Sequence, residues 1–137
     1  MAKLKAMVVD DMYANQFLLA SILEGMGCSF SMASNGKEVF DLLESEGLFD
    51  IIFMDIEMPV MNGIEATQKL ISDPRYKNIP VVALTAHNIE DFYSEYDGVG
   101  FSRVIEKPLT FDGIADIIDN VRRRGDAALF EYCEKSK

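Results

Sequence analysis

The chain alternates short continuous runs of apolar residues with segments whose apolar residues recur every three or four positions. The continuous runs are typical of buried parallel strands, and they lie at 4–9, 28–33, 51–54, 79–84 and 104–106. The recurring positions predict amphipathic helices, and these lie at 13–26, 35–43, 64–72, 88–96 and 110–121. The pattern therefore predicts five strand–helix units in succession.

Five such units predict an α/β fold, with a parallel sheet covered by helices on both faces and joined by right-handed crossovers. The pattern alone leaves the strand order open. For five units the common doubly wound order is 2-1-3-4-5, in which the ligand crevice lies outside the carboxyl ends of the first and third strands. We therefore expect a five-stranded (βα)5 sheet in this order.

Residues at the helix ends support these boundaries. Ser34 or Asn35 is a suitable N-cap for the second helix, and Thr110 is one for the last. The third helix is expected to stop before Asp73-Pro74, because the residue before a proline disfavours helical geometry. In the first helix, the apolar residues with helical spacing are Phe17, Leu18, Ile22 and Leu23.

The composition is that of an ordinary globular domain, with 49% hydrophobic and 26% charged residues among 137. We expect one domain over 1–124 and a tail at 125–137 that is too short to be an output domain. The formal net charge of -10 argues against direct binding to nucleic acid or an anionic membrane, since both are bound through Lys and Arg.

Cys28 and Cys133 lack metal-binding spacing and are interpreted as free thiols. Because we find no signal peptide or membrane-spanning run, the expected location is the cytoplasm.

Polar and charged residues follow several of the predicted strands. They are Asp10 and Asp11 after the first strand, Asp55 after the third, Thr85 after the fourth and Lys107 after the fifth. Because the carboxyl ends of parallel strands share one edge of a sheet, all five side chains are expected at that edge. An isolated Asp pair is more often a helix cap, and a lone Lys-Pro is weak evidence. Five such residues at the ends of four strands indicate a site.

The chemistry of this set indicates a divalent cation and a phosphoryl group. Two carboxylates about 4 Å apart repel by roughly 4 kcal/mol at an effective dielectric constant of about 20, and a hard cation with oxygen ligands relieves that repulsion. The absence of nearby Cys or His argues against zinc, so Mg²⁺ is the expected metal. A carboxylate beside Mg²⁺, a lysine and a threonine is placed to attack phosphorus and form an acyl phosphate.

Four sequence motifs contain these residues. They are Val8-Val9-Asp10-Asp11, Met54-Asp55-Ile56-Glu57-Met58-Pro59-Val60-Met61-Asn62-Gly63, Ala83-Leu84-Thr85-Ala86 and Lys107-Pro108. The motifs resemble those of receiver domains from two-component response regulators, which have a flavodoxin-like fold, and the similarity covers about 4–124, nearly the whole chain. By this resemblance Asp55 is the phosphoacceptor, Thr85 supplies the switch hydroxyl and Lys107 pairs with the phosphoryl group. The Lys107–Pro108 bond would be cis.

The resemblance also implies a ligand set and a function. Asp11, Asp55 and the backbone carbonyl of Glu57 would bind Mg²⁺ directly, and Asp10 would support the metal through water. The protein would be a phosphorylation-dependent signalling switch that receives its phosphoryl group from a histidine kinase or a histidine phosphotransfer protein. It would catalyse only its own phosphorylation and dephosphorylation, so it is not expected to be an enzyme in the usual sense. A stand-alone regulator and the receiver of a hybrid kinase both remain open, and the downstream protein partner is not indicated.

Three further positions bear on this resemblance. Receiver domains usually carry Tyr or Phe three residues before the lysine, and this chain has Val104 there. In the family this ring changes rotamer as the switch hydroxyl moves, which couples the site to an output surface. The resemblance therefore does not imply this coupling for the present chain, and Phe101 does not match the position. Glu57 and His87 correspond to family positions that flank the path of the hydrolysing water, and we interpret His87 as a surface residue at the pocket rim.

Two other classes of protein use a similar sheet. Haloacid-dehalogenase-type phosphatases combine an Asp nucleophile with Thr, Lys and acidic metal ligands, but their Asp-x-Asp motif is not matched by Asp10-Asp11-Met12. The chain also leaves no residues for a substrate-recognising cap. A flavodoxin-like electron carrier needs a Ser/Thr/Gly-rich phosphate loop after the first strand, where the two aspartates would repel the flavin phosphate.

Overall fold

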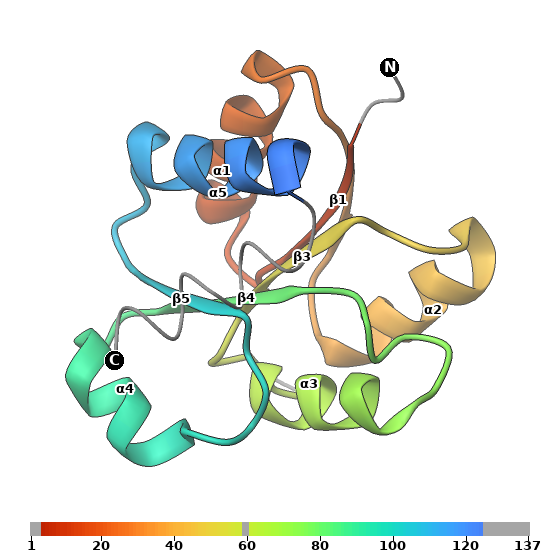
Figure 1. Ribbon diagram of the computed structural model, residues 1–137, viewed down its shortest axis with the longest axis vertical. Helices are drawn as coiled ribbons and strands as arrows, with labels where there is room; N and C mark the ends of the chain where they lie inside the picture. Colours follow the sequence, from red (N-terminus) through yellow and green to blue (C-terminus); the bar gives the residue numbers. More distant parts are fainter. Residues whose placement is uncertain (1–3, 59–60, 125–137) are drawn as a thin grey trace.

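The computed structural model of the chain describes residues 4–58 and 61–124 (Figure 1). The strands in this part of the chain form one parallel sheet in the order β2-β1-β3-β4-β5, which confirms the expected topology. They are β1 Lys5–Val9, β2 Ser29–Ala33, β3 Ile51–Asp55, β4 Val81–Thr85 and β5 Arg103–Glu106. Of the residues considered above, Pro59, Val60, Cys133 and the expected tail at 125–137 lie outside the described residues.

Helices cover both faces of this sheet (Figure 1). They are α1 Tyr13–Gly25, α2 Gly36–Glu46, α3 Gly63–Ser72, α4 Ile89–Tyr96 and α5 Phe111–Arg124. Helices α1 and α5 lie together on one face, and α2, α3 and α4 lie on the other. This is the layered arrangement that alternating strands and helices predict. Within the described ranges, no helix combines the length and the apolar character that a membrane span requires.

Alternate residues of the central strands pack into the two layers, which is why these strands are apolar throughout. In β3, Ile51 and Phe53 pack with residues of α1 and α5, whereas Ile52 and Met54 pack with residues of α2 and α3. All four side chains are fully buried. Strand β2 lies at the edge of the sheet and is partly exposed, as its mixed sequence predicts. The buried run of β3 places Asp55 at the centre of the carboxyl edge.

Side-chain caps are present at the starts of both helices whose N-caps the sequence suggests. The Asn35 side chain accepts a hydrogen bond from the Glu38 N–H at 3.0 Å, so Asn35 rather than Ser34 is the N-cap of α2. The Thr110 hydroxyl accepts from the Gly113 N–H at 3.1 Å, as expected for the start of α5. Each bond satisfies an N–H group that the first turn of a helix leaves without a partner.

The inward face of α1 includes only some of its regularly spaced apolar residues. Ile22 and Leu23 are buried, whereas Phe17 and Leu18 are 57% and 43% exposed. The other buried residues of this helix are Gln16, Leu19 and Ala20. Apolar residues occupy the consecutive positions 17–20, so their spacing alone does not single out one face. The result is an exposed apolar surface on α1.

Gly63 lets the start of α3 lie against the end of β3. A Cβ atom at this position would lie 2.2 Å from the Asp55 carbonyl oxygen, which is far inside van der Waals contact. The Gly63 N–H also donates to the Ile56 carbonyl at 3.0 Å. The start of α3 is therefore held close to the strand end from which Asp55 projects.

Candidate functional site

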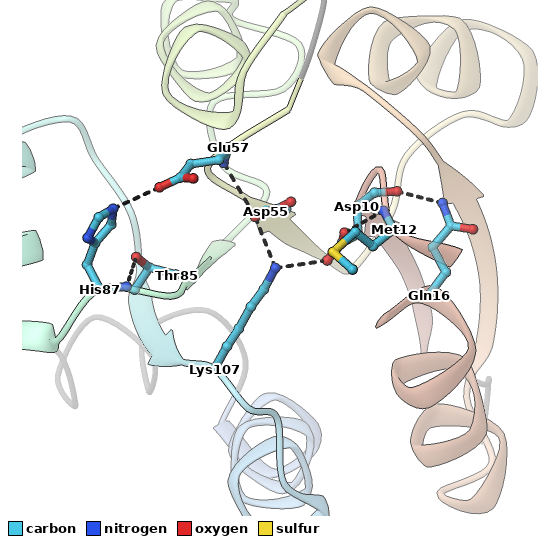
Figure 2. Close-up of polar contacts among 8 residues, drawn as sticks. All are labelled: Asp10, Met12, Gln16, Asp55, Glu57, Thr85, His87 and Lys107. Carbon is cyan, nitrogen blue, oxygen red and sulfur yellow. Dashed lines mark hydrogen bonds and ion pairs between the residues drawn. The ribbon is translucent and has the colours of Figure 1, made fainter. Parts of the chain in front are cut away.

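Figure 2 shows four of the residues predicted for the site together at the carboxyl edge of the sheet, namely Asp10, Asp55, Thr85 and Lys107. Asp10 directly follows β1, Asp55 and Thr85 are the last residues of β3 and β4, and Lys107 directly follows β5. The parallel register places Asp55 opposite Leu84, the residue before Thr85. The Lys107–Pro108 peptide bond is cis, as the resemblance implies. The ends of four strands thus supply one group of side chains.

Three carboxylates form an acidic cluster at this edge. One oxygen atom each of Asp10, Asp11 and Asp55 lies within 4.8 Å of the other two. Asp10 and Asp55 are only 1% and 5% exposed, whereas Asp11 is open to solvent. Three converging carboxylate oxygens suit a hard divalent cation that prefers oxygen ligands. The donor set therefore fits the Mg²⁺ ion expected from the sequence.

Lys107 reaches between the two buried carboxylates. Its Nζ atom lies 3.2 Å from Asp10 Oδ2 and 3.2 Å from Asp55 Oδ1 (Figure 2). Burial disfavours the ammonium charge, but the charges of Asp55 and Asp10 outweigh that effect and raise the pKa of Lys107. Its side chain is thus held positively charged beside any group bound to Asp55.

The surroundings of Asp55 disfavour its charge. Burial and, next, the nearby charge of Asp10 raise the pKa of Asp55 to about 6, although Lys107 and the Glu57 N–H act in the opposite direction. The Glu57 nitrogen lies 3.4 Å from Asp55 Oδ1. A carboxylate whose charge is incompletely balanced has a strong tendency to bind a cation. Such perturbed groups cluster at functional sites.

A cavity of about 300 Å³ opens at the acidic cluster. Asp55, Thr85 and Lys107 line it, together with Met12 just before α1. The Thr85 hydroxyl oxygen accepts from the His87 N–H at 3.0 Å, which leaves the hydroxyl proton to donate to a ligand. The cavity therefore places a hydroxyl and an ammonium group, which can bind a small anion, beside the Asp55 carboxylate.

A larger open hollow of about 760 Å³ lies at the C-terminal end of α3. Its lining includes Asp73 and Arg75, whose side chains form a surface ion pair with an N–O distance of 2.8 Å. The hollow contains none of the residues predicted for the site. Its greater volume therefore does not make it the better candidate, because the smaller cavity holds the buried carboxylates and the lysine.

Glu57 and His87 meet at the rim of the cavity. Their side chains are 70% and 60% exposed, and His87 Nε2 lies 2.8 Å from Glu57 Oε1. The contact joins the loop after β3 to the loop after β4 (Figure 2). It places His87 on the surface near the site, as expected from the sequence. The role of the Glu57 carbonyl as a Mg²⁺ ligand stays a prediction.

Val104 is buried at the position where receiver domains usually carry an aromatic residue. It is 6% exposed and belongs to a cluster with Ala83 and Phe92. Phe101 packs against the same cluster, with its ring centroid 5.6 Å from that of Phe92. Aromatic rings therefore fill this region from other positions of the chain, and Val104 offers no ring that could change rotamer.

Gln16 was not predicted to belong to the site. It is 7% exposed, and its Nε2 atom lies 2.6 Å from the Asp10 carbonyl oxygen. The signal available in the sequence is a polar residue at helical spacing from Leu19 and Leu23, on the face of α1 that the sheet covers. A buried amide needs a partner, and its partner here is the backbone of the loop that carries the acidic cluster.

The chain is similar in sequence to known proteins. A family model described as the response regulator receiver domain matches residues 6–119. Two-component response regulator 24 of Arabidopsis thaliana is 37% identical over 85% of this chain and 83% of its own length. Hybrid signal transduction histidine kinase E of Dictyostelium discoideum is 35% identical over 82% of this chain but only 7% of its own length. The chain thus corresponds to most of a small regulator and to a small part of a large kinase.

A solved complex contains a chain of the same fold. It joins the Saccharomyces cerevisiae histidine phosphotransfer protein Ypd1 to the receiver domain of its downstream response regulator Ssk1. The match has 27% identity and a TM-score of 0.77, and it covers 86% of this chain and 88% of that chain. The family match favours neither the phosphatase nor the flavodoxin alternative. By its sequence, its strand order and its edge cluster, the chain belongs to the response regulator receiver domains of two-component systems.

Proposed function

We propose that the chain is a phosphorylation-dependent switch of a two-component phosphorelay and that Asp55 accepts the phosphoryl group. The observation that carries the assignment is the placement of Asp55. It is a buried carboxylate that lines the cavity, with Lys107 Nζ at 3.2 Å and the Thr85 hydroxyl in the same lining. Asp10 is also buried and also contacts Lys107, but it is not part of the cavity lining, and both of its carboxylate oxygens accept hydrogen bonds, Oδ1 from the Met12 N–H and Oδ2 from Lys107. Asp55 is therefore the better nucleophile.

Phosphoryl transfer to Asp55 forms one bond and breaks another. A carboxylate oxygen of Asp55 attacks the phosphorus of a phosphohistidine, and the P–N bond breaks. The electron pair of that bond returns to the imidazole of the donor, and an acyl phosphate remains on Asp55. The Lys107 ammonium and the Thr85 hydroxyl are placed to bind phosphoryl oxygens and to balance their charge.

We assign Mg²⁺ to the acidic cluster. Asp11, Asp55 and the Glu57 carbonyl would be its direct ligands, and Asp10 would support it through water. When bound, the ion supplies positive charge that offsets the carboxylates and the incoming phosphoryl group. The support for this assignment is the convergence of three carboxylate oxygens within 4.8 Å of one another.

The surface beside the cavity favours a protein as the phosphoryl donor. Met12, Tyr13, Phe17 and Leu18 are exposed by 57%, 67%, 57% and 43%, and the rings of Tyr13 and Phe17 are in contact, tilted by 37° with centroids 4.8 Å apart. Met12 also lines the cavity, so this α1 surface borders the entrance to Asp55. Exposed apolar patches of this kind mark interaction sites. We propose that a histidine kinase or histidine phosphotransfer protein covers the α1 surface when its phosphohistidine reaches Asp55.

The proposed protein is a signalling module whose own catalysis is limited to gaining and losing its phosphoryl group. We assign the receiver domain to 1–124 and treat 125–137 as a tail. The buried, free thiol of Cys28 supports a reducing, cytoplasmic setting.

Peptide mapping tests the proposed phosphoacceptor. The native protein is incubated with a small phosphodonor and Mg²⁺, and the phosphorylated peptides are sequenced by mass spectrometry under conditions that preserve acyl phosphates. The modification is expected on Asp55. A phosphoryl group that maps to Asp10, Asp11 or any other residue of the native protein would overturn the assignment.

A further inference from the structure

We propose that Gln16 is a positioning residue for the metal site and that it acts by fixing the peptide group between Asp10 and Asp11. The inference rests on the proposed Mg²⁺ site. Gln16 Nε2 donates to the Asp10 carbonyl oxygen at 2.6 Å (Figure 2). The plane of that peptide group also contains the Asp11 nitrogen and Cα. Holding the carbonyl therefore sets the direction in which the backbone enters Asp11.

The other polar groups of Asp10 are fixed at the same time. Its N–H donates to the Ala33 carbonyl at 3.1 Å, its Oδ1 accepts from the Met12 N–H at 2.9 Å, and its Oδ2 lies 3.2 Å from Lys107 Nζ. Gln16 supplies the anchor for the remaining group, the carbonyl oxygen. Asp10 is thus connected to β2, to the loop before α1, to the residue after β5 and to α1 itself.

Asp11 depends on this anchoring more than Asp10 does. Its side chain is exposed, so tight packing does not set its direction. A carboxylate that binds a metal needs supporting groups behind it to hold its orientation, and loss of such support commonly weakens metal binding. Because Asp11 follows the anchored carbonyl directly, Gln16 is placed to provide that support.

Gln16 is also well suited to act as a fixed support. Its Nε2 lies 3.4 Å from both the Ala33 carbonyl oxygen and Ser34 Oγ, in addition to its short bond to Asp10. Long side chains in a helix lean toward the helix N-terminus, which explains how Gln16 reaches a carbonyl earlier in the chain. A buried amide costs free energy unless it is hydrogen-bonded. An apolar residue would satisfy packing alone, so the amide is explained by its bonds to the loop.

The test compares Gln16→Met with the native protein. Methionine keeps the length and the apolar stem of the side chain but removes the donor. Titration calorimetry with Mg²⁺ is expected to show a dissociation constant about tenfold higher in the variant. Gln68→Met is the matched control, since Gln68 is exposed on α3, and its Mg²⁺ affinity should equal that of the native protein.

A second measurement separates positioning from a merely structural role. The alternative is that Gln16 only stabilises the packing of α1 on the sheet. In that case Gln16→Met will lower the melting temperature in chelator but leave the Mg²⁺ affinity of the folded protein unchanged. That result would overturn the inference. Gln16→Asn is used as well, because it stays polar and is one methylene too short to reach the Asp10 carbonyl. Native affinity in both folded variants contradicts the role of Gln16 but not the metal site. A native protein that binds no Mg²⁺ overturns both.

Discussion

At the scale of single residues, Asp55 shows a conflict between the proposed chemistry and the stability of the metal-free fold. It is buried close to Asp10, and its pKa is raised to about 6 for that reason. The positive charge of Lys107 reduces the repulsion between Asp10 and Asp55, but this one charge is shared between the two carboxylates. Unfavourable arrangements of this kind are expected where a site must later bind a cation and a phosphoryl group.

Asp55→Asn should stabilise the metal-free protein, and the gain should depend on pH. The pKa of Asp55 is raised from its ordinary value of 3.8 to about 6 in the folded protein. Between these two pH values the folded state holds a proton that the unfolded state has released, so native stability falls as the pH rises through this window. The gain from Asn should therefore be small below a pH of about 4 and reach about 1 kcal/mol above a pH of about 7, since solvent at the cavity mouth screens the charges.

Urea unfolding in chelator at several pH values measures this gain. Asp41→Asn, on the exposed side of α2, is the control and should show no comparable rise in stability across the window. An Asp55→Asn variant that is less stable than the native protein at neutral pH would show that the carboxylates do not repel each other as described.

The contact between Glu57 and His87 leads to a second prediction at this scale. Both side chains lie at the cavity rim and are separated by 2.8 Å, so Glu57→Gln and His87→Gln should each change the rate at which the acyl phosphate is lost. The fold should be unaffected, because both side chains are exposed.

Residues in contact also show coupled effects, so the change in the rate of the double variant should differ from the sum of the changes in the two single variants. Loss of phosphoryl label over time measures the rate, with Glu44→Gln on α2 as the control. Unchanged rates in both single variants would contradict the rim assignment.

At the scale of secondary-structure elements, α1 has two faces with different tasks. On the buried face, Gln16 donates to the Asp10 carbonyl in the loop after β1. On the exposed face, Tyr13 and Phe17 lie beside the cavity. The sequence pattern predicted the helix but not these faces, because consecutive apolar residues at 17–20 obscure the period. Packing of Leu19 and Leu23 against the sheet decides which residues remain outside.

Phe17→Gln should slow phosphoryl transfer from a protein donor and leave phosphorylation by a small donor unchanged. An aromatic side chain at the centre of an interface commonly contributes more than 1 kcal/mol to binding, so its loss should lower the affinity for the donor by about fivefold or more. The experiment uses a phosphorylated histidine phosphotransfer protein and, separately, a small phosphodonor. Leu48→Gln is the control, since Leu48 is 65% exposed and lies before β3. Equal slowing with both donors, or no slowing with either, would contradict docking on the α1 surface.

Val104 in β5 leads to the second prediction at the scale of elements. Tyr at this position should alter the ratio between the affinities of the phosphorylated and unphosphorylated forms for a phosphotransfer protein, because it restores a ring that can have different free energies in the two states. The region is already filled by Phe92 and Phe101, so Val104→Tyr should also cost about 1–3 kcal/mol of stability. Val104→Ile controls for added volume. The same ratio in all three proteins would show that the signal passes through other residues.

At the scale of the whole molecule, the sequence predicted those features that depend on where buried strands end. The apolar run before Asp55 and the similar run before Thr85 identify central strands, and parallel strands bring their carboxyl ends to one edge. The equal sharing of Lys107 between Asp10 and Asp55 could not be predicted, since it depends on side-chain positions across separate strands. The start of one strand also differs from the predicted position for a local reason. Strand β4 begins at Val81 rather than at 79, because Pro80 has no N–H group to donate to the sheet.

The central claim is that one site, built from four strand ends, takes one phosphoryl group on Asp55 with the help of Mg²⁺. Intact-mass measurement during incubation with a small phosphodonor tests it most directly. The native protein and Asp41→Asn should each gain one phosphoryl group per chain with Mg²⁺ and none in chelator, and Asp55→Asn should gain none in either condition. An Asp55→Asn variant that is phosphorylated as fast as the native protein, or a native protein that is phosphorylated equally well in chelator, would contradict the account.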